Sequence, residues 1–317
     1  MTKPVSKTVT PRANPLPIAR KCHCDEAVAM LDSRLVHEHA DVLGVKVSAI
    51  NLDMAVNLAE QWVAAGKSGY VCVTGVHGVM EAQSDPELRQ ILNQAVINTP
   101  DGMPMTWVGR YQGFDHMDRV FGPDFMTAMC RVSVERGYRN FLYGGKPGVA
   151  ELLSKTLQTR FPGLQVVGTY TPPFRNLTPE EANELTALVR ESKPHIVWVG
   201  LSTPKQERFM AQFVDRLQAP LLVGVGAAFD YHTGSIHDCS AWVKRTGLQW
   251  LHRLLQDPRR LWKRYLRNNP AFLWHIMWQF SGLREYPDYK EAQTVETMAS
   301  LSHGSISLPA QVRGSGK

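Results

Sequence analysis

Cysteine is scarce in this sequence of 317 residues, and its pattern is not that of a metal centre or a disulfide framework. The five cysteines are an odd number, and only Cys22 and Cys24 lie close together. A structural zinc site needs a second pair of ligands at suitable spacing, which we do not find. This cysteine usage is typical of a reducing compartment, and we expect no metal at the pair.

Long hydrophobic runs are also missing. The first 20 residues hold no apolar stretch of the kind that a secretory signal requires. The longest apolar candidate, residues 271–280, is about half of the ~20 residues that a transmembrane helix needs, and it contains His275. We therefore expect a chain that is neither secreted nor membrane-spanning.

Acidic residues are nearly absent from one segment near the C-terminus. Between Ala241 and Arg284 there are nine Lys and Arg residues, and Asp257 is the only acid. Because the net charge of the whole chain is +6, the basic excess belongs to this segment, which also holds five of the eight tryptophans. Such a composition favours a membrane surface. A packed subdomain with a solvated face and a nucleic-acid groove are the alternatives.

The remaining composition, 44% hydrophobic and 20% charged, is typical of a soluble globular protein with a sizeable core. Short apolar segments alternate with helical patterns along the middle of the chain. This alternation predicts a Rossmann-like α/β fold, a parallel sheet with helices on both faces. The expected strands are residues 69–73, 140–143, 164–168, 195–200 and 220–224, and the expected helices are 77–95 with a break near 84–86, a run ending at 160, 178–192 and 204–217.

Four regions follow from these patterns. The proline-rich N-terminus shows no periodicity, and the far end is rich in Ser, Gly and Thr. We divide the chain into a flexible N-terminal extension (1–45), an α/β core (46–239), a basic, Trp-rich C-terminal helical appendage (240–286) and a disordered tail (287–317).

Two turn-rich segments could carry chemistry. Gly144 and Gly145 follow a predicted strand and precede a helix, where glycines let the backbone approach a phosphate. An ordinary tight turn is the alternative. Asp101 stands in a Pro-Asp-Gly turn just before a helical run, and it is either a helix cap or a carboxylate general base.

Two further loops offer polar groups at the ends of predicted strands. Lys205, Gln206 and Glu207 crowd the first turn of a helix, which suits either a nucleotide or sugar site or simple helix initiation. Gly226 and Asp230 follow the last strand, and Asp230 could accept hydrogen bonds from sugar hydroxyls, although an ordinary turn between strand and helix is the alternative. Neither glycine loop fits the dinucleotide fingerprint G-x-G-x-x-G, which disfavours a nucleotide-dependent oxidoreductase.

Six sequence blocks occur together in the order seen in one family. Over about residues 45–284 the sequence resembles the WecG/TagA/CpsF glycosyltransferases. The blocks that carry this resemblance are residues 100–104, 119–124, 141–145, 199–207, 224–230 and 247–253 followed by 257–260.

The resemblance implies an inverting transfer of a hexose or N-acetylhexosamine from a UDP-sugar to a polyprenyl-diphosphate-linked saccharide, in cell-surface polysaccharide synthesis. It implies a cytoplasmic protein, peripheral on the inner face of the membrane, with a homo-oligomer plausible and no nucleic-acid partner. We expect no cofactor. The chain lacks Asp-x-Asp, with which many sugar-nucleotide enzymes hold a divalent metal, and this favours a metal-independent mechanism.

The resemblance also assigns residues. The catalytic carboxylate falls on Asp101, the characteristic arginine on Arg119 and the glutamine on Gln206. The acceptor-binding cations fall on Arg253 and Arg260, with Lys263 or Arg264 near a third position. We expect the donor to contact Thr74, His77, Gly144, Gly145, Lys205, Gln206, Glu207, Gly226 and Asp230.

One position departs from the family pattern. The family often has Thr-x-Asn after the first strand, whereas this chain has Thr74-Gly75-Val76-His77. His77 either takes over a polar role or is structural. Two other classes remain as alternatives, a nucleotide-dependent oxidoreductase and a nucleic-acid-binding protein that uses the basic segment.

Overall fold

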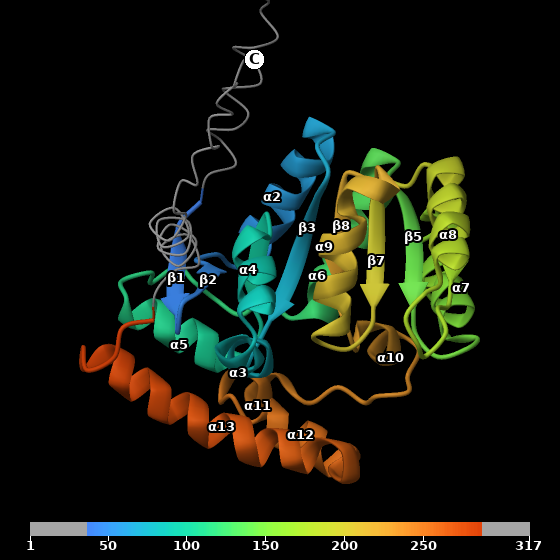
Figure 1. Cartoon of the computed structure of the whole chain (residues 1–317). Helices are drawn as coiled ribbons and strands as arrows, with labels where there is room; N and C mark the ends of the chain where they lie inside the picture. Colours follow the sequence, from blue (N-terminus) through green and yellow to red (C-terminus); the bar gives the residue numbers. More distant parts are fainter. Residues whose placement is uncertain (1–36, 287–317) are drawn as a thin grey trace, which may run out of the picture. The chain divides into compact units, whose positions relative to one another are not determined.

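The computed structural model describes residues 37–286, and a six-stranded parallel sheet forms its centre (Figure 1). The strand order is β4-β3-β8-β7-β5-β6, and every neighbouring pair is parallel. The predicted Rossmann-like α/β fold is confirmed. The strands are β3 (Gly69–Thr74), β4 (Ile97–Pro100), β5 (Arg139–Gly144), β6 (Gln165–Tyr170), β7 (Ile196–Gly200) and β8 (Leu221–Gly224).

Helices cover both faces of the sheet because alternate strand residues point to opposite sides. In β7, Val197 and Val199 pack into one hydrophobic cluster, and Ile196 and Trp198 pack into the other. The first cluster lies under α4 (Pro86–Gln94), α8 (Pro179–Ser192) and α9 (Lys205–Leu217). The second lies under α2 (Leu52–Ala65), α6 (Gly122–Arg136) and α7 (Val149–Arg160).

Local sequence signals explain where several helices start. Thr178 and Glu181 form a reciprocal capping box at α8, with Thr178 N donating to Glu181 Oε2 at 2.8 Å. The predicted break near residues 84–86 separates α3 (Val76–Ser84) from α4, where Asp85 caps the new helix and Pro86 opens it. Both features were readable from sequence because they depend on neighbouring residues only.

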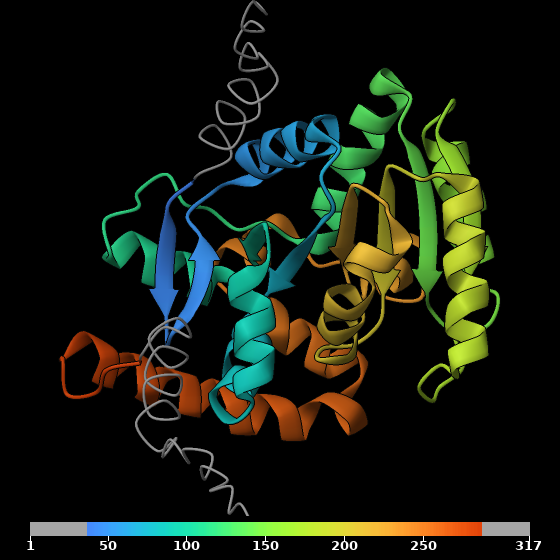
Figure 2. The ribbon, with the colours of Figure 1, turned by 45° about the horizontal axis from the view of Figure 1, so that its top comes forward.

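Helices α10 to α13 follow the last strand and run past the carboxyl edge of the sheet (Figure 2). They are α10 (Ala228–His232), α11 (Ala241–Arg245), α12 (Gln249–Gln256) and α13 (Pro258–Phe280). Helix α13 packs against α3, and its buried residues recur at the spacing of one helix face: Leu261, Asn268, Phe272 and Ile276. Within residues 37–286, no helix combines the length and the apolar character needed to cross a bilayer.

The N-terminal boundary predicted from sequence is wrong. An antiparallel hairpin of β1 (His39–Val42) and β2 (Val45–Ser48) lies inside the expected flexible extension of residues 1–45. The pattern is hidden because each strand has only four residues. Four further elements lacked a prediction, namely β4, α2, α6 and α10. The rest of the extension, residues 1–36, and the expected tail, 287–317, lie outside the described residues.

Candidate active site

A cleft of about 1600 Å³ opens at the carboxyl edge of the sheet. Loops after all six strands of the sheet line it, and α12 and α13 contribute a further wall. Carboxyl ends of parallel strands are where ligands bind in α/β folds. The cleft holds nearly all of the residues predicted from sequence, namely Thr74, His77, Asp101, Arg119, Gly145, Lys205, Gln206, Glu207, Gly226, Asp230, Arg253, Arg260 and Arg264.

Asp101 stands at the end of β4, where its backbone N donates to Thr74 O at 2.9 Å. Its side chain does not cap the next helix, α5 (Met103–Tyr111), since the N-cap is Gly102 and makes no side-chain bond. Instead the carboxylate faces Arg119, with 3.8 Å between Asp101 Oδ1 and Arg119 Nε. The helix-cap alternative is therefore excluded, and the carboxylate is available to a ligand in the cleft.

The electrostatic surroundings of Asp101 make it a stronger proton acceptor than an ordinary aspartate. Burial raises the pKa of the carboxyl, and Asp124 raises it further, while the guanidinium groups of Arg119 and Arg253 oppose this. The net direction is upward from the usual value of 3.8. A raised pKa brings a carboxylate closer to the range in which general bases work.

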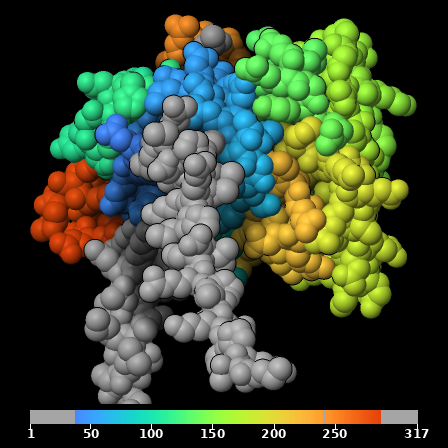
Figure 3. Space-filling model, turned by 90° about the horizontal axis from the view of Figure 1, so that it is seen from above, coloured from blue at the N-terminus to red at the C-terminus, as the bar shows by residue number. Residues whose placement is uncertain are grey.

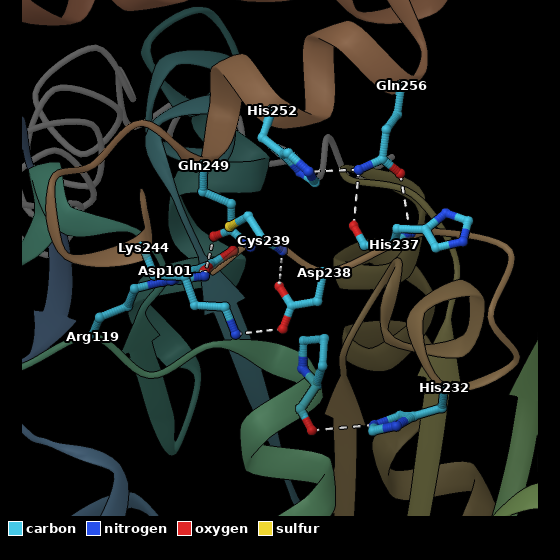
Figure 4. A network of polar contacts seen from close by, with 11 residues as sticks. Asp101, Arg119, His232, His237, Asp238, Cys239, Lys244, Gln249, His252 and Gln256 are labelled. Atoms are coloured by element: carbon cyan, nitrogen blue, oxygen red, sulfur yellow. Dashed lines mark hydrogen bonds and ion pairs between the residues drawn. The ribbon is translucent and has the colours of Figure 1, made fainter. Parts of the chain in front are cut away.

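Arg119 is held from two sides. Val120 N donates to Pro100 O at 2.9 Å, which fixes this loop beside the end of β4. The Arg119 guanidinium lies 4.3 Å from the ring centroid of Phe121, and its Nη2 donates to Gln249 Oε1 on α12 (Figure 4). Only 9% of the side chain is exposed. Arg119 thus has one orientation relative to Asp101.

Gln249 was not among the residues predicted from sequence. It belongs to the block at 247–253 that carried the family resemblance, and this was the available signal. Its Oε1 accepts from Arg119, while its Nε2 is buried and has no hydrogen-bond partner among the described residues. Gln249 therefore connects the C-terminal helices directly to the group facing Asp101.

Cationic side chains from the C-terminal helices lie along the wall of the cleft near Arg119. Arg253 lies 5.2 Å from the ring centroid of Tyr231, and Lys244 lies 5.3 Å from that of Phe121. Lys244 also pairs with Asp238 (Figure 4). These contacts hold positive charge near the cleft while leaving N–H groups available.

The predicted acceptor-binding cations divide into two groups. Arg253, Arg260 and Arg264 line the cleft, and Arg264 Nε is buried without a partner among residues 37–286. Arg260 forms an ion pair with Asp257 at 2.5 Å. Lys263 does not line the cleft, and its ammonium lies 5.6 Å from the ring of Trp262. Of the two candidates near the third position, Arg264 is the one that lines the cleft.

Gln206 and Glu207 open α9 but are almost fully buried, with 2% and 1% exposed. Gln206 Oε1 accepts from Gly226 N at 3.0 Å, and its Nε2 donates to Glu207 Oε1 at 2.9 Å. Burial raises the pKa of Glu207, whose Oε1 also accepts from Thr203. This network joins the loops after β7 and β8, so Gln206 shapes the cleft wall while Lys205 and Asp230 line it.

The two glycines at the carboxyl end of β5 differ in their surroundings. Gly145 lines the cleft, whereas Gly144 does not. Gly144 has φ +123°, and a Cβ there would lie 2.6 Å from Gly200 O on the neighbouring strand. Close packing of the two backbones explains why residue 144 is a glycine. Because Gly144 does not line the cleft, its position does not support the predicted contact with the donor.

His77 links the core to the C-terminal helices. Its Nδ1 lies 3.0 Å from Asn268 Nδ2 on α13 and 3.6 Å from Glu81. Burial, and then the charge of Arg264, lower its pKa to about 4, so the ring is neutral at neutral pH. Thr74 Oγ1, three residues earlier at the end of β3, is buried without a hydrogen-bond partner in the described part of the chain. His77 lines the cleft and also ties α3 to α13.

Several buried polar atoms around the cleft have no hydrogen-bond partner within residues 37–286. Burying such groups unpaired is costly, so their clustering in one cleft is typical of a ligand site. The same residues 37–286 contain no cluster of three His, Cys, Asp or Glu side chains placed to hold a metal ion. The unpaired atoms are Thr74 Oγ1, Arg119 Nε, Glu207 Oε2, Gln249 Nε2 and Arg264 Nε.

Comparison with known proteins agrees with this site. The family model described as Glycosyl transferase WecG/TagA/CpsF family matches residues 40–286. A relative from Bacillus spizizenii is 26% identical over 210 residues, which is 66% of this chain and 79% of the relative. That protein is named N-acetylglucosaminyldiphosphoundecaprenol N-acetyl-beta-D-mannosaminyltransferase. The matched range contains every residue placed at the cleft, and we conclude that the chain is a glycosyltransferase that belongs to the WecG/TagA/CpsF family.

Proposed function

We propose that this glycosyltransferase moves a hexose or N-acetylhexosamine from a UDP-sugar to a saccharide linked to a polyprenyl diphosphate. The relative's name supports this acceptor class, since it describes an N-acetylglucosaminyl-diphosphoundecaprenol substrate. The observation that carries the proposal is the Asp101 carboxylate, which faces a cleft with arginine side chains in its walls. A base beside cations suits attack of a hydroxyl on a sugar diphosphate.

The reaction needs one proton acceptor. In the proposed step, an acceptor hydroxyl oxygen attacks the anomeric carbon from the face opposite UDP. The new glycosidic bond forms as the bond from the anomeric carbon to the phosphate oxygen breaks, and the hydroxyl proton passes to Asp101. A single displacement of this kind inverts the anomeric configuration. The raised pKa of Asp101 favours this proton transfer.

The departing UDP takes the bonding electron pair and must be stabilised. Arg119 and Arg264 line the cleft, and the Nε atom of each is buried without a hydrogen bond to residues 37–286; Arg253 lines the same cleft. Guanidinium groups bind diphosphate oxygens in a fixed two-pronged geometry. We propose that these arginines share the two diphosphates, those of donor and acceptor, and that the transfer proceeds without a metal ion.

The acceptor's lipid places the reaction at a membrane. The basic, Trp-rich helices α11 to α13 form the wall of the cleft that the acceptor diphosphate would reach. Positive charge and exposed aromatic rings together favour the interface of an anionic bilayer. We propose a peripheral location on the cytoplasmic face.

A donor screen tests the proposal. The full chain is offered UDP-glucose, UDP-N-acetylglucosamine and UDP-N-acetylmannosamine with a short polyprenyl-diphosphate-sugar acceptor, in the presence of chelator. We expect acceptor-dependent UDP release from one donor, and a product of inverted configuration by NMR. Release that requires added Mg²⁺ or Mn²⁺ would contradict the metal-free mechanism, and no release from any donor would contradict the substrate class.

A further inference from the structure

We propose that helix α5 forms part of the surface with which this enzyme contacts an anionic lipid bilayer, through the side chains of Trp107 and Tyr111. The inference rests on the proposed function, which places the acceptor's lipid in a membrane. It adds a core helix to a contact that the sequence assigned to the C-terminal segment alone.

Helix α5 exposes two large aromatic side chains. Trp107 is 50% exposed and Tyr111 is 71% exposed. They are four residues apart and therefore share one face of the helix. Met105 and Val108 are buried on the other side of α5. The helix is thus anchored in the core while it presents aromatic rings outward.

Both rings join the surface of the C-terminal helices. The Tyr111 ring lies 4.1 Å from that of Phe280, at the end of α13. Trp107 lies against Gly247, where an added Cβ would come within 2.9 Å of the indole. Figure 3 shows α5 and the red end of α13 on the same side of the molecule. The exposed aromatic surface therefore continues from α13 onto α5.

The neighbouring surface of α13 has the chemistry of a membrane interface. Its outward side leaves Leu266, Trp274 and Met277 more than half exposed. Arg259, Lys263 and Arg267 are exposed on the same helix. Amphipathic interfacial helices combine apolar side chains with Lys and Arg in this way, and the single sign of charge complements anionic headgroups. An anionic bilayer complements both the apolar and the basic side chains of this surface.

The position of α5 gives this contact a function. The helix begins two residues after Asp101, and Trp107 also lines the cleft. If α5 rests on the bilayer, the mouth of the cleft lies at headgroup level, where the diphosphate of a lipid-linked acceptor is found. The proposed base then lies at the N-terminal end of the helix that makes the membrane contact.

Vesicle flotation of the full chain tests the inference. The vesicles contain equal parts of phosphatidylcholine and phosphatidylglycerol, and the variants are Trp107→Gln, Tyr111→Gln and the double variant. We expect about fivefold weaker partitioning for each single change and at least about tenfold for both. The matched control is Leu152→Gln, a half-exposed apolar residue on α7 away from this surface, which should bind like wild type.

A conservative variant separates surface chemistry from folding. Tyr111→Phe keeps the ring and should partition like wild type, and thermal unfolding identifies any variant that is misfolded. A double variant that binds vesicles within about twofold of wild type overturns the inference while leaving the proposed function intact. If wild type itself does not bind, the proposed membrane location fails and the inference fails with it. A change in oligomeric state without lipid would assign the surface to a second copy and overturn the inference.

Discussion

Arg119 Nη2 donates a hydrogen bond to Gln249 Oε1, and this contact joins two residues that are 130 positions apart. Arg119 lies beside the Asp101 carboxylate, while Gln249 opens α12. The contact therefore links the C-terminal helices to the electrostatic surroundings of the proposed base. Burial is the largest cause of the raised pKa of Asp101, and Arg119 opposes it, so a change in the position of Arg119 would change that pKa.

Replacing Gln249 should move the pH profile. Gln249→Leu removes the oxygen that holds Arg119, so the guanidinium is free to move away from Asp101. The pKa of Asp101 then rises, and the acid limb of kcat/KM should shift upward by about half a pH unit or more. The other titratable groups near Asp101 are Asp124, Arg253 and Tyr231, and the substitution leaves them unchanged.

Gln256→Leu is the matched control for this prediction. Gln256 lies on the same helix, but its amide holds the backbone of His237, with Nε2 donating to the carbonyl at 2.8 Å. It does not line the cleft. We expect this variant to keep the wild-type acid limb. An unchanged pH profile in Gln249→Leu would contradict the positioning role.

His77 should make stability depend on pH. Its pKa is about 4 in the folded protein and 6.5 as the ordinary value. The unfolded chain therefore binds more protons between these values, so stability is full above about pH 6.5 and falls as the pH decreases towards 4. Between pH 7 and pH 5, the titration of His77 alone should lower the free energy of unfolding by about 2 kcal/mol.

Urea unfolding of His77→Gln measures that contribution. His39 has a similarly lowered pKa, so wild type keeps a pH dependence from both groups. Between pH 7 and pH 5, the free energy of unfolding of the variant should fall by about 2 kcal/mol less than that of wild type. Equal losses in the two proteins would show that the His77 pKa is not lowered.

Gly144 should be required for stability. An alanine would adopt φ +123° and place its Cβ 2.6 Å from Gly200 O, so we expect Gly144→Ala to lower the free energy of unfolding by about 2 kcal/mol or more. Gly66 also has positive φ, but nothing lies within 4 Å of its Cβ position. Gly66→Ala should cost about 1 kcal/mol. Similar losses in the two urea titrations would refute the packing explanation.

Much of the fold was readable from sequence because it depends on local patterns. The apolar strands around Trp198 and the capping box at Thr178 are examples. The four-residue strand β4 was missed, since its short segment ends in the turn that holds Asp101. The hairpin was missed for a similar reason, because each strand is too short to show periodicity.

The sequence predicted which residues form the site better than it predicted what each of them does there. The family resemblance brought Asp101 and Arg119 to one place, and the structure puts them 3.8 Å apart. It could not show that Gln206 binds Gly226 N, or that Gly144 packs on the next strand, because both are contacts between distant segments. Gln249 was missed for the same reason.

The most direct test of the account compares wild type with Asp101→Asn. Asparagine keeps the shape of the side chain but cannot take the proton of the acceptor hydroxyl. We predict that transfer falls by at least about a hundredfold, while calorimetry shows UDP binding within about twofold of wild type. A folded Asp101→Asn enzyme that transfers sugar at the wild-type rate would contradict the role of Asp101 as the base.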